Sequence, residues 1–220
     1  SNSDLEFKAA GTGAVRIEDI IVNENNLSTN IGALVRTLNN PNAYTLSRDD
    51  YFGTSIAIDG NTAIIGAPGE DEFGFNEGKA YIINVTTGAL LHTIDNPNDY
   101  GNAQSDFFGG RVGISGNYAI VGTPSEDGDE GSGTVPSFGK VYIFNVTSGA
   151  LVHTIDNPNA FGDQGYDNFG LSVAISGNLA IVGTPTEDNA DGNNSGVAYI
   201  FNVTTGALVH TLDNPNPYGT

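Results

Sequence analysis

The sequence predicts an all-β fold built from β-propeller blades, and two observations carry this prediction. A stretch that runs from Phe169 to Pro185 has close copies beginning at Phe52 and Phe108, spaced by 56 and 61 residues. Each copy opens a unit of four short apolar segments separated by turns rich in Gly and Asn. Four antiparallel strands per repeat of this length are typical of propeller blades, because solenoid units are shorter and carry fewer strands.

The second unit shows how the four strands are expected to lie. We predict strand A at 111–114, a tight turn at 115–117 and strand B at 118–121. Strand C is predicted at 140–144 and strand D at 150–155. Strands A and B are apolar almost throughout, as strands buried on both faces are, whereas strand D alternates and carries a His. We therefore expect A to be the innermost strand and D the outermost.

The chain divides into a short N-terminal segment and a repeat region. Residues 1–31 contain brief predicted strands such as 5–7 and 20–22, which cannot form a core alone. The repeat begins in mid-unit, because residues 32–38 match the final strand of each later unit. Region 32–220 is thus predicted to hold one extra strand and three full blades, with units starting near residues 52, 108 and 169.

Composition excludes several classes of partner. The chain has 26 acidic and 7 basic residues, a net charge of −19, so nucleic acid and anionic membranes would repel it. No apolar run approaches the 18 or so residues of a membrane span, so we expect no membrane insertion. The absence of Cys excludes disulfides and thiolate chemistry. The absence of Met suggests a piece of a longer polypeptide, or a processed one.

The repeated pattern resembles a known family. Phe-Gly, an apolar strand, Gly-Asn, a second apolar strand and Gly-Ala-Pro or Gly-Thr-Pro, then Gly-x-x-Tyr-Ile-Phe, resembles the FG-GAP repeat of integrin α-chain propellers and of many bacterial and viral surface proteins. The resemblance covers about residues 32–220. It implies that the repeated Phe packs between blades and that the Gly after it permits a tight entry into strand A. The residues concerned are Phe52, Gly53, Phe108, Gly109, Phe169 and Gly170.

The departures from the family are as informative as the match. Integrin-type propellers carry an Asp-x-Asp-x-Asp-Gly calcium loop between strands A and B, but the turns here are only Asp-Gly-Asn or Ser-Gly-Asn. Such propellers usually close with about seven blades, so either further sequence or further chains would have to complete the ring. Separately, the N-terminal segment resembles the short strand-turn modules of phage tail-fibre shafts, in which three chains intertwine.

The long loops between strands B and C contain the candidate binding residues. A Pro-x-Glu-Asp core occurs in each of these three loops, and long loops on a rigid scaffold often carry binding function. The candidates are Glu70, Asp71, Glu126, Asp127, Asp129, Glu187, Asp188 and Asp191. Calcium is the one cofactor suggested, at Glu70, Asp71, Glu126, Asp127, Glu187 and Asp188, because clustered carboxylates supply the oxygens it needs. The alternative is a solvated acidic loop that keeps this edge soluble.

Other recurring residues have simpler explanations. Asp50, Asp106 and Asp167 precede each Phe-Gly and suit a structural role in a turn, with a ligand role as the alternative. His92, His153 and His210 lie in different blades, so they cannot converge on a metal and are expected at the surface. Asn84, Asn145 and Asn202 fit a glycosylation pattern but also a turn, which we favour. The aromatic residues Tyr44, Tyr100, Phe161 and Tyr218 are expected to cover blade junctions, or to stack on sugars.

These observations favour a protein without enzymatic activity. No Ser/His/Asp or His/Glu set gathers into one constellation, and the carboxylate pairs repeat equally in every unit, whereas catalysis tends to break symmetry. We expect an extracellular or virion surface protein of the fibre or adhesin type. It would bind a receptor, a glycan or a neighbouring subunit through the B–C and D–A loops and would self-associate. The alternative is a purely structural fibre subunit whose blades are completed or stacked between chains.

Overall fold

The computed structural model describes residues 20–23, 26–29, 34–41, 49–70, 77–97, 106–126, 138–158, 167–188 and 194–215. All regular elements in these ranges are strands, and the chain forms two compact units, residues 1–37 and 38–220. In the first unit, β1 (Ile20–Asn23) and β2 (Asn26–Thr29) pair as an antiparallel hairpin. The strand predicted at 20–22 is confirmed, while the one at 5–7 lies outside the described residues.

The second unit contains three four-stranded antiparallel sheets, each ordered A–B–C–D along the chain, as predicted. Blade 1 comprises β3 (Ser55–Asp59), β4 (Thr62–Ala67), β5 (Lys79–Asn84) and β6 (Leu90–Asp95). Blade 2 comprises β7 (Arg111–Ser115), β8 (Tyr118–Thr123), β9 (Lys140–Asn145) and β10 (Leu151–Asp156). Blade 3 comprises β11 (Ser172–Ser176), β12 (Leu179–Thr184), β13 (Val197–Asn202) and β14 (Leu208–Asp213). The predicted strand ends are correct to within two residues.

Local side-chain chemistry shapes the short turns. In blade 2, Gly116 adopts a φ of 54°, a left-handed conformation that Gly reaches without steric cost. In the C–D turn, Oδ1 of Asn145 accepts hydrogen bonds from the backbone N–H of Thr147 at 3.0 Å and of Ser148 at 2.9 Å. This is the behaviour of Asn in a turn, and it confirms the turn interpretation of the Asn-Val-Thr pattern.

The apolar core lies between successive blades. Phe108 is fully buried in a cluster that joins Ile64 and Ile82 of blade 1 to Tyr142 and Phe144 of blade 2. A second cluster places Phe169 in the same way between blades 2 and 3. The implied role of these two Phe residues is therefore confirmed. Phe52, which has no blade before it among the described residues, is only partly buried.

The Gly-Ala-Pro and Gly-Thr-Pro motifs have a packing explanation. A Cβ atom on Gly66 would lie 1.8 Å from the carbonyl oxygen of Gly109, and one on Gly122 would lie 2.2 Å from that of Gly170. Only Gly allows such an approach of two backbones. Gly109 and Gly170 have φ of 85° and 87°, so the expected tight entry into strand A is confirmed.

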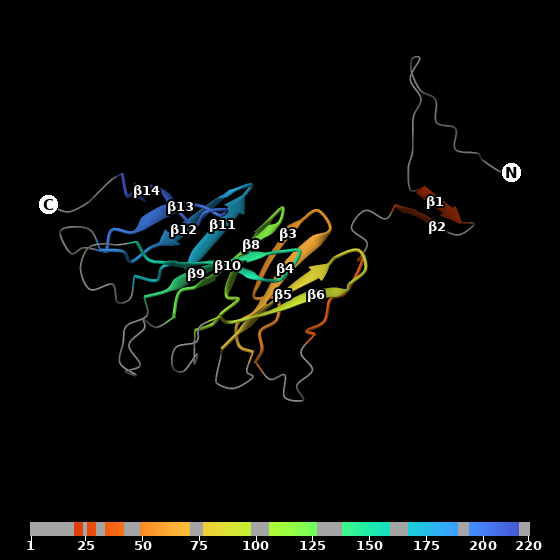
Figure 1. The fold of residues 1–220 in the computed structure, drawn as a ribbon. Coiled ribbons are helices and arrows are strands. Elements are labelled where there is room, and N and C mark those ends of the chain that lie inside the picture. The colour runs from red at the N-terminus through yellow and green to blue at the C-terminus, as the bar shows by residue number, and fades with distance from the viewer. Residues whose placement is uncertain are drawn as a thin grey trace, which may run out of the picture. The chain divides into compact units, whose positions relative to one another are not determined.

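Successive blades meet along their A strands. Strand β3 packs against β7, and β7 packs against β11, while the D strands remain largely exposed. The blades lie side by side in chain order (Figure 1), and those in the described residues do not close a ring. The expectation that strand A is buried is wrong for β3 and β11, neither of which has a fully buried residue. Ile56 and Ile58 of β3 are 71% and 65% exposed because no blade of the described chain covers them.

Candidate functional site at the loop-bearing edge

All B–C and D–A connections leave the blades at one edge, here called the loop edge. Strands β4, β8 and β12 end there, and strands β5, β9 and β13 begin there (Figure 1). The short A–B and C–D turns lie at the opposite edge, because neighbouring strands are antiparallel. The candidate binding residues that the structure describes, Glu70, Glu126, Glu187 and Asp188, thus share one edge of the unit.

A glutamate closes the base of each B–C loop. The backbone N–H of Glu126 donates to the carbonyl of Thr123 at 3.1 Å, and its own carbonyl accepts from Gly139 at 3.1 Å. Glu70 accepts from Gly78 at 2.9 Å in blade 1, and Glu187 accepts from Gly196 at 3.2 Å in blade 3. The two ends of each loop are thereby held together at the edge of the sheet.

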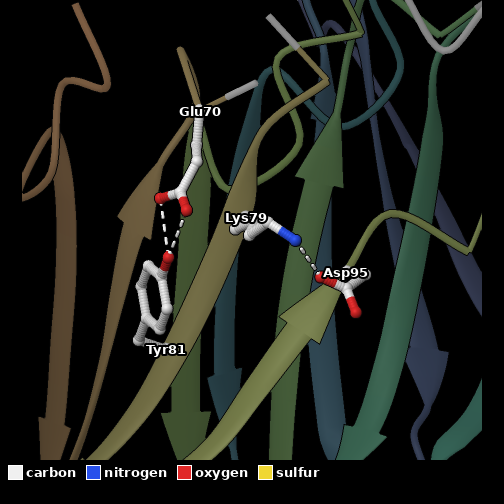
Figure 2. Close-up of polar contacts among 4 residues, drawn as sticks. All are labelled: Glu70, Lys79, Tyr81 and Asp95. Atoms are coloured by element: carbon white, nitrogen blue, oxygen red, sulfur yellow. Dashed lines mark hydrogen bonds and ion pairs between the residues drawn. The ribbon is translucent and has the colours of Figure 1, made fainter. Parts of the chain in front are cut away.

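The side chains of these glutamates point inward. Glu70, Glu126 and Glu187 are 1%, 0% and 1% exposed. The hydroxyl of Tyr81 donates to Glu70 at 2.6 Å (Figure 2), and the hydroxyl of Tyr142 donates to Glu126 at 2.5 Å. The alternative of a solvated acidic loop is therefore wrong for these three residues, because each carboxyl group belongs to a buried polar cluster.

A second buried acid lies beside each glutamate. Asp50, Asp106 and Asp167 are 7%, 1% and 2% exposed. Each accepts a hydrogen bond from the side-chain amide of an Asn: Asn96 and Asn157 follow strand D of a blade, and Asn40 follows residues 34–38. The extra strand predicted at 32–38 is not found in the described residues 34–38. The pairs are Asn40 with Asp50 at 2.8 Å, Asn96 with Asp106 at 2.9 Å and Asn157 with Asp167 at 3.0 Å. Asn157 also donates to Glu187 at 3.1 Å, so one amide bridges both acids. These contacts support the structural role expected for the aspartates.

Burial changes the protonation of the cluster. Desolvation raises the pKa of Glu126 to about 8, with Asp106 adding to the rise and the Tyr142 hydrogen bond opposing it. Desolvation likewise raises the pKa of Glu70, and it raises the pKa of Tyr81 and Tyr142 above their ordinary range. Burial therefore favours the protonated form of Glu126 at neutral pH, and the negative charge of nearby Asp106 adds to this effect.

A lysine accompanies this cluster in two blades only. In blade 1, Lys79 forms an ion pair with Asp95 (Figure 2). In blade 2, Nζ of Lys140 lies 3.8 Å from Glu126 and 3.7 Å from Asp156. Blade 3 has Val197 at the equivalent position. The lysine is therefore not needed for the loop base to form.

The described residues do not by themselves fit a calcium site. Within the described ranges, no three His, Asp or Glu side chains gather as metal ligands. Both carboxyl oxygens of Glu70 and Oε1 of Glu126 accept hydrogen bonds from Tyr hydroxyl groups, whereas Oε2 of Glu126 has no hydrogen-bond partner among the described residues. Calcium stays a prediction that depends on residues beyond those ranges. A melting temperature that chelator leaves unchanged would remove it, since a bound ion stabilises the folded state.

The other candidate residues are placed as follows. Asp188 is half-buried and forms an isolated β-bridge with Asn194. Asp71, Asp127, Asp129 and Asp191 lie outside the described residues, as do Tyr44, Tyr100, Phe161 and Tyr218. Their binding roles stay predictions.

The histidines have a role that sequence analysis missed. Nε2 of His92 lies 3.0 Å from the carbonyl oxygen of Thr147, and Nε2 of His153 lies 3.1 Å from that of Thr204. Each His thus reaches from strand D of one blade to the C–D turn of the next. His210 has no following blade in the described chain and is exposed. The repeat of His at one position was the available signal.

The described residues thus form an open array of propeller-like blades, and a buried acid cluster lies at the base of each long loop. A family model described as the FG-GAP repeat matches residues 43–83, 99–144 and 162–201, and the chain belongs to this family. The resemblance to phage tail fibres has no such support.

No curated protein matches the chain. Among solved structures, the chain is similar to the "computationally designed Ika4 protein", with a TM-score of 0.46, 14% identity, and coverage of 78% of this chain and 76% of that one. In the described ranges, nothing helical has the length and apolar character of a membrane span.

Proposed function

We propose that this chain is a non-enzymatic module of an extracellular or virion surface protein, and that its loop edge binds a receptor, a glycan or a neighbouring subunit. FG-GAP repeats are typical of surface or adhesion-type repeat domains and are generally non-enzymatic, which supports the class. The finer assignment depends on how the loop edge is built.

The observation that carries the proposal is the identical base under each long loop. In all three blades a buried Glu joins the two ends of the loop. Such a base lets the outer part of the loop vary in sequence and length without disturbing the sheet, as binding loops on rigid scaffolds do. The loops also carry acidic residues on a chain of net charge −19. A basic or neutral polar partner surface suits this charge.

Loop replacement tests the proposal. Residues 127–137 of the second loop would be replaced by a short Gly-Ser linker, which keeps Glu126 and Gly139 in place to close the base. Binding is then measured on a printed glycan array. We expect wild-type chain to bind a defined set of glycans and the replaced variant to lose most of that signal. Ala150→Lys changes an exposed residue of the opposite edge and serves as the matched control.

The outcomes separate the two candidate functions. Equal glycan binding by the wild type and the loop variant would contradict a role for the loop edge. No glycan binding, together with formation of filaments, would favour the second candidate, a structural subunit in which chains stack on one another. That second candidate is supported by the exposed apolar residues at both ends of the array, including Ile56 at 71% and Ile181 at 41%.

A further inference from the structure

Blades 1 and 2 each contain a slot that holds the Phe-Gly step of the next blade. A Cβ on Gly78 would lie 2.1 Å from the carbonyl oxygen of Phe108, and one on Gly139 would lie 2.2 Å from that of Phe169. The amide N–H of Phe108 also donates to the carbonyl of Glu77 at 3.2 Å. The slot therefore fits the backbone of this dipeptide, and the Phe ring enters the core beside it.

The equivalent slot of blade 3 is an open cavity of about 560 Å³. Its lining includes Gly183, Gly196, Ala198 and Leu212, which occupy the positions that line the slots of the other blades. The three atoms nearest to a Cβ on Gly183 all belong to Ser172, and those nearest to a Cβ on Gly196 all belong to Pro185, both within blade 3. Within the described residues, no Phe-Gly step enters this cavity.

The apolar residues that are buried at the junction with the next blade in blades 1 and 2 are exposed in blade 3. Ile64 and Ile120 are fully buried, whereas their counterpart Ile181 is 41% exposed. Ile155 is 5% exposed, and its counterpart Leu212 is 45% exposed. The last blade thus ends in the same surface that the first two blades use to bind a neighbour.

The opposite end of the array, at blade 1, carries the surface that complements this cavity. A Cβ on Gly109 would lie 2.2 Å from the carbonyl oxygen of Lys79, but one on Gly53 would meet nothing within 4 Å. Ile114 is 7% exposed, whereas its counterpart Ile58 is 65% exposed. Phe52–Gly53 is thus a Phe-Gly step that occupies no slot in the described chain.

We propose that Phe52–Gly53 of one copy of this chain inserts into the Gly183–Gly196 cavity of a second copy, so that chains join head to tail. The proposal develops the structural candidate above and is independent of binding at the loop edge. A second copy fits because the two surfaces are the halves of a junction that the chain itself makes twice.

Polar groups at the two ends of the array also match those that pair between neighbouring blades inside the chain. Within the chain, Asp59 accepts from the amide of Gly116 at 2.6 Å, and Ser115 accepts from that of Gly177 at 3.0 Å. Ser176 at the end of blade 3 would accept in the same way from Gly60 of the incoming copy. His210 would likewise donate to the carbonyl of Thr86 of that copy, as His92 and His153 do inside the chain.

One segment must move for docking to occur. Residues 38–41 contact the first blade through Leu38, beside Phe52, and through Asn40, on Asp50. Residues 212–215 of the receiving copy are their counterparts and would occupy the same place. Strand β14 is paired with β13 along its length, whereas 38–41 lies in no strand, so the incoming copy's 38–41 gives way. Asn214 then takes the place of Asn40 on Asp50.

The contact is heterologous, so it can be tested by complementation. Sedimentation of the full chain is followed over a wide concentration range, in moderate salt because every copy carries a charge of −19. We expect wild type to form species larger than a monomer. Ala198→Arg fills the cavity and Ile56→Arg charges the entry surface, so each variant alone should lose these species. Mixed in equal amounts, the variants should form a dimer that grows no further, since each retains one intact half.

Two controls keep the test decisive. Leu151→Arg adds the same charge to a D strand at a residue 44% exposed, and it should associate like wild type. Leu38→Ala loosens the displaced segment and should lower the concentration needed for association. A wild type that stays monomeric, or a mixture of the two variants that does not dimerise, would overturn the proposal. A monomeric chain that binds a synthetic peptide of residues 165–171 would also overturn it, because the cavity would then belong to a following repeat unit.

Discussion

Blades 2 and 3 have nearly the same sequence and the same strand pairing. They differ in the burial of the face that each blade turns toward the next unit along the chain. Ile120 and Ile143 of blade 2 are fully buried, whereas Ile181 of blade 3 is 41% exposed and Ile200 is only partly buried. The difference arises because blade 3 covers this face of blade 2, whereas no blade of the described chain covers the same face of blade 3. In repeat proteins each unit depends on its neighbour for burial, so stability is a sum of unit and interface terms.

The largest expected effect in this comparison is a loss of unfolding free energy at the repeated Phe. Phe169→Ala removes a fully buried ring from the junction of blades 2 and 3 and should cost about 3–5 kcal/mol of unfolding free energy. Phe52→Ala removes a partly buried ring that contacts Tyr81 at the uncovered end, and it should cost less than half as much. Urea unfolding measures both. Equal losses would show that the end of the array is covered by some other part of the chain.

A second test compares equivalent isoleucines. Ile120→Ala creates a cavity in a buried junction and should cost about 2–5 kcal/mol, whereas Ile181→Ala should cost roughly 1 kcal/mol or less. The two residues occupy the same strand position and face, so propensity is matched. The measurement is again urea unfolding at a protein concentration where the chain is monomeric. If self-association is allowed, the Ile181 variant should lose the larger species.

At the loop edge, by contrast, the glutamates of blades 2 and 3 do not differ in burial. Glu126 and Glu187 are both buried, so the acid cluster does not need a following blade. The pKa of Glu126 is raised to about 8, above its ordinary value near 4.5. The folded chain therefore binds this proton more tightly than the unfolded chain, and its stability falls as pH rises between these values.

The expected slope for this one group is at most about 1.4 kcal/mol per pH unit. Glu126→Gln keeps the shape without the ionisation, so it should reduce the loss of stability between pH 5 and pH 8. Asp213→Asn, at an exposed carboxyl group, is the control and should leave the slope unchanged. Thermal melts across pH measure the effect. A slope identical in the Glu126 variant and the wild type would show that this carboxyl group ionises normally.

The smallest expected effect concerns the histidines. His153→Ala removes a hydrogen bond to the next blade and should cost about 0.5–1.5 kcal/mol. His210→Ala, at the same position of the last blade, should have almost no effect on the monomer. Urea unfolding of both variants gives the difference. A comparable loss at His210 would indicate a partner for it beyond the described residues.

Features that depend on a few adjacent residues were predicted well from the sequence, and features that depend on residues distant along the chain were not. The turn at Gly116 and the turn at Asn145 were predictable, because a few adjacent residues determine their backbone conformation. The number of blades followed from the copies of Phe-Gly. The burial of Glu126 was not predictable, because its Tyr142 partner lies 16 residues away and Asp106 belongs to a different connection. An acidic residue in a polar loop gives no sign of such partners.

The sequence by itself determined the repeat, the order of strands in each blade and the family, since these depend on residue type and spacing along the chain. The tertiary structure decided which copies of the same residue are buried. Ile120 and Ile181 have the same neighbours in sequence, but only Ile120 has a blade packed over it. The reason is that burial depends on what the fold places in contact with a residue, and the two ends of an open array lack one neighbour each.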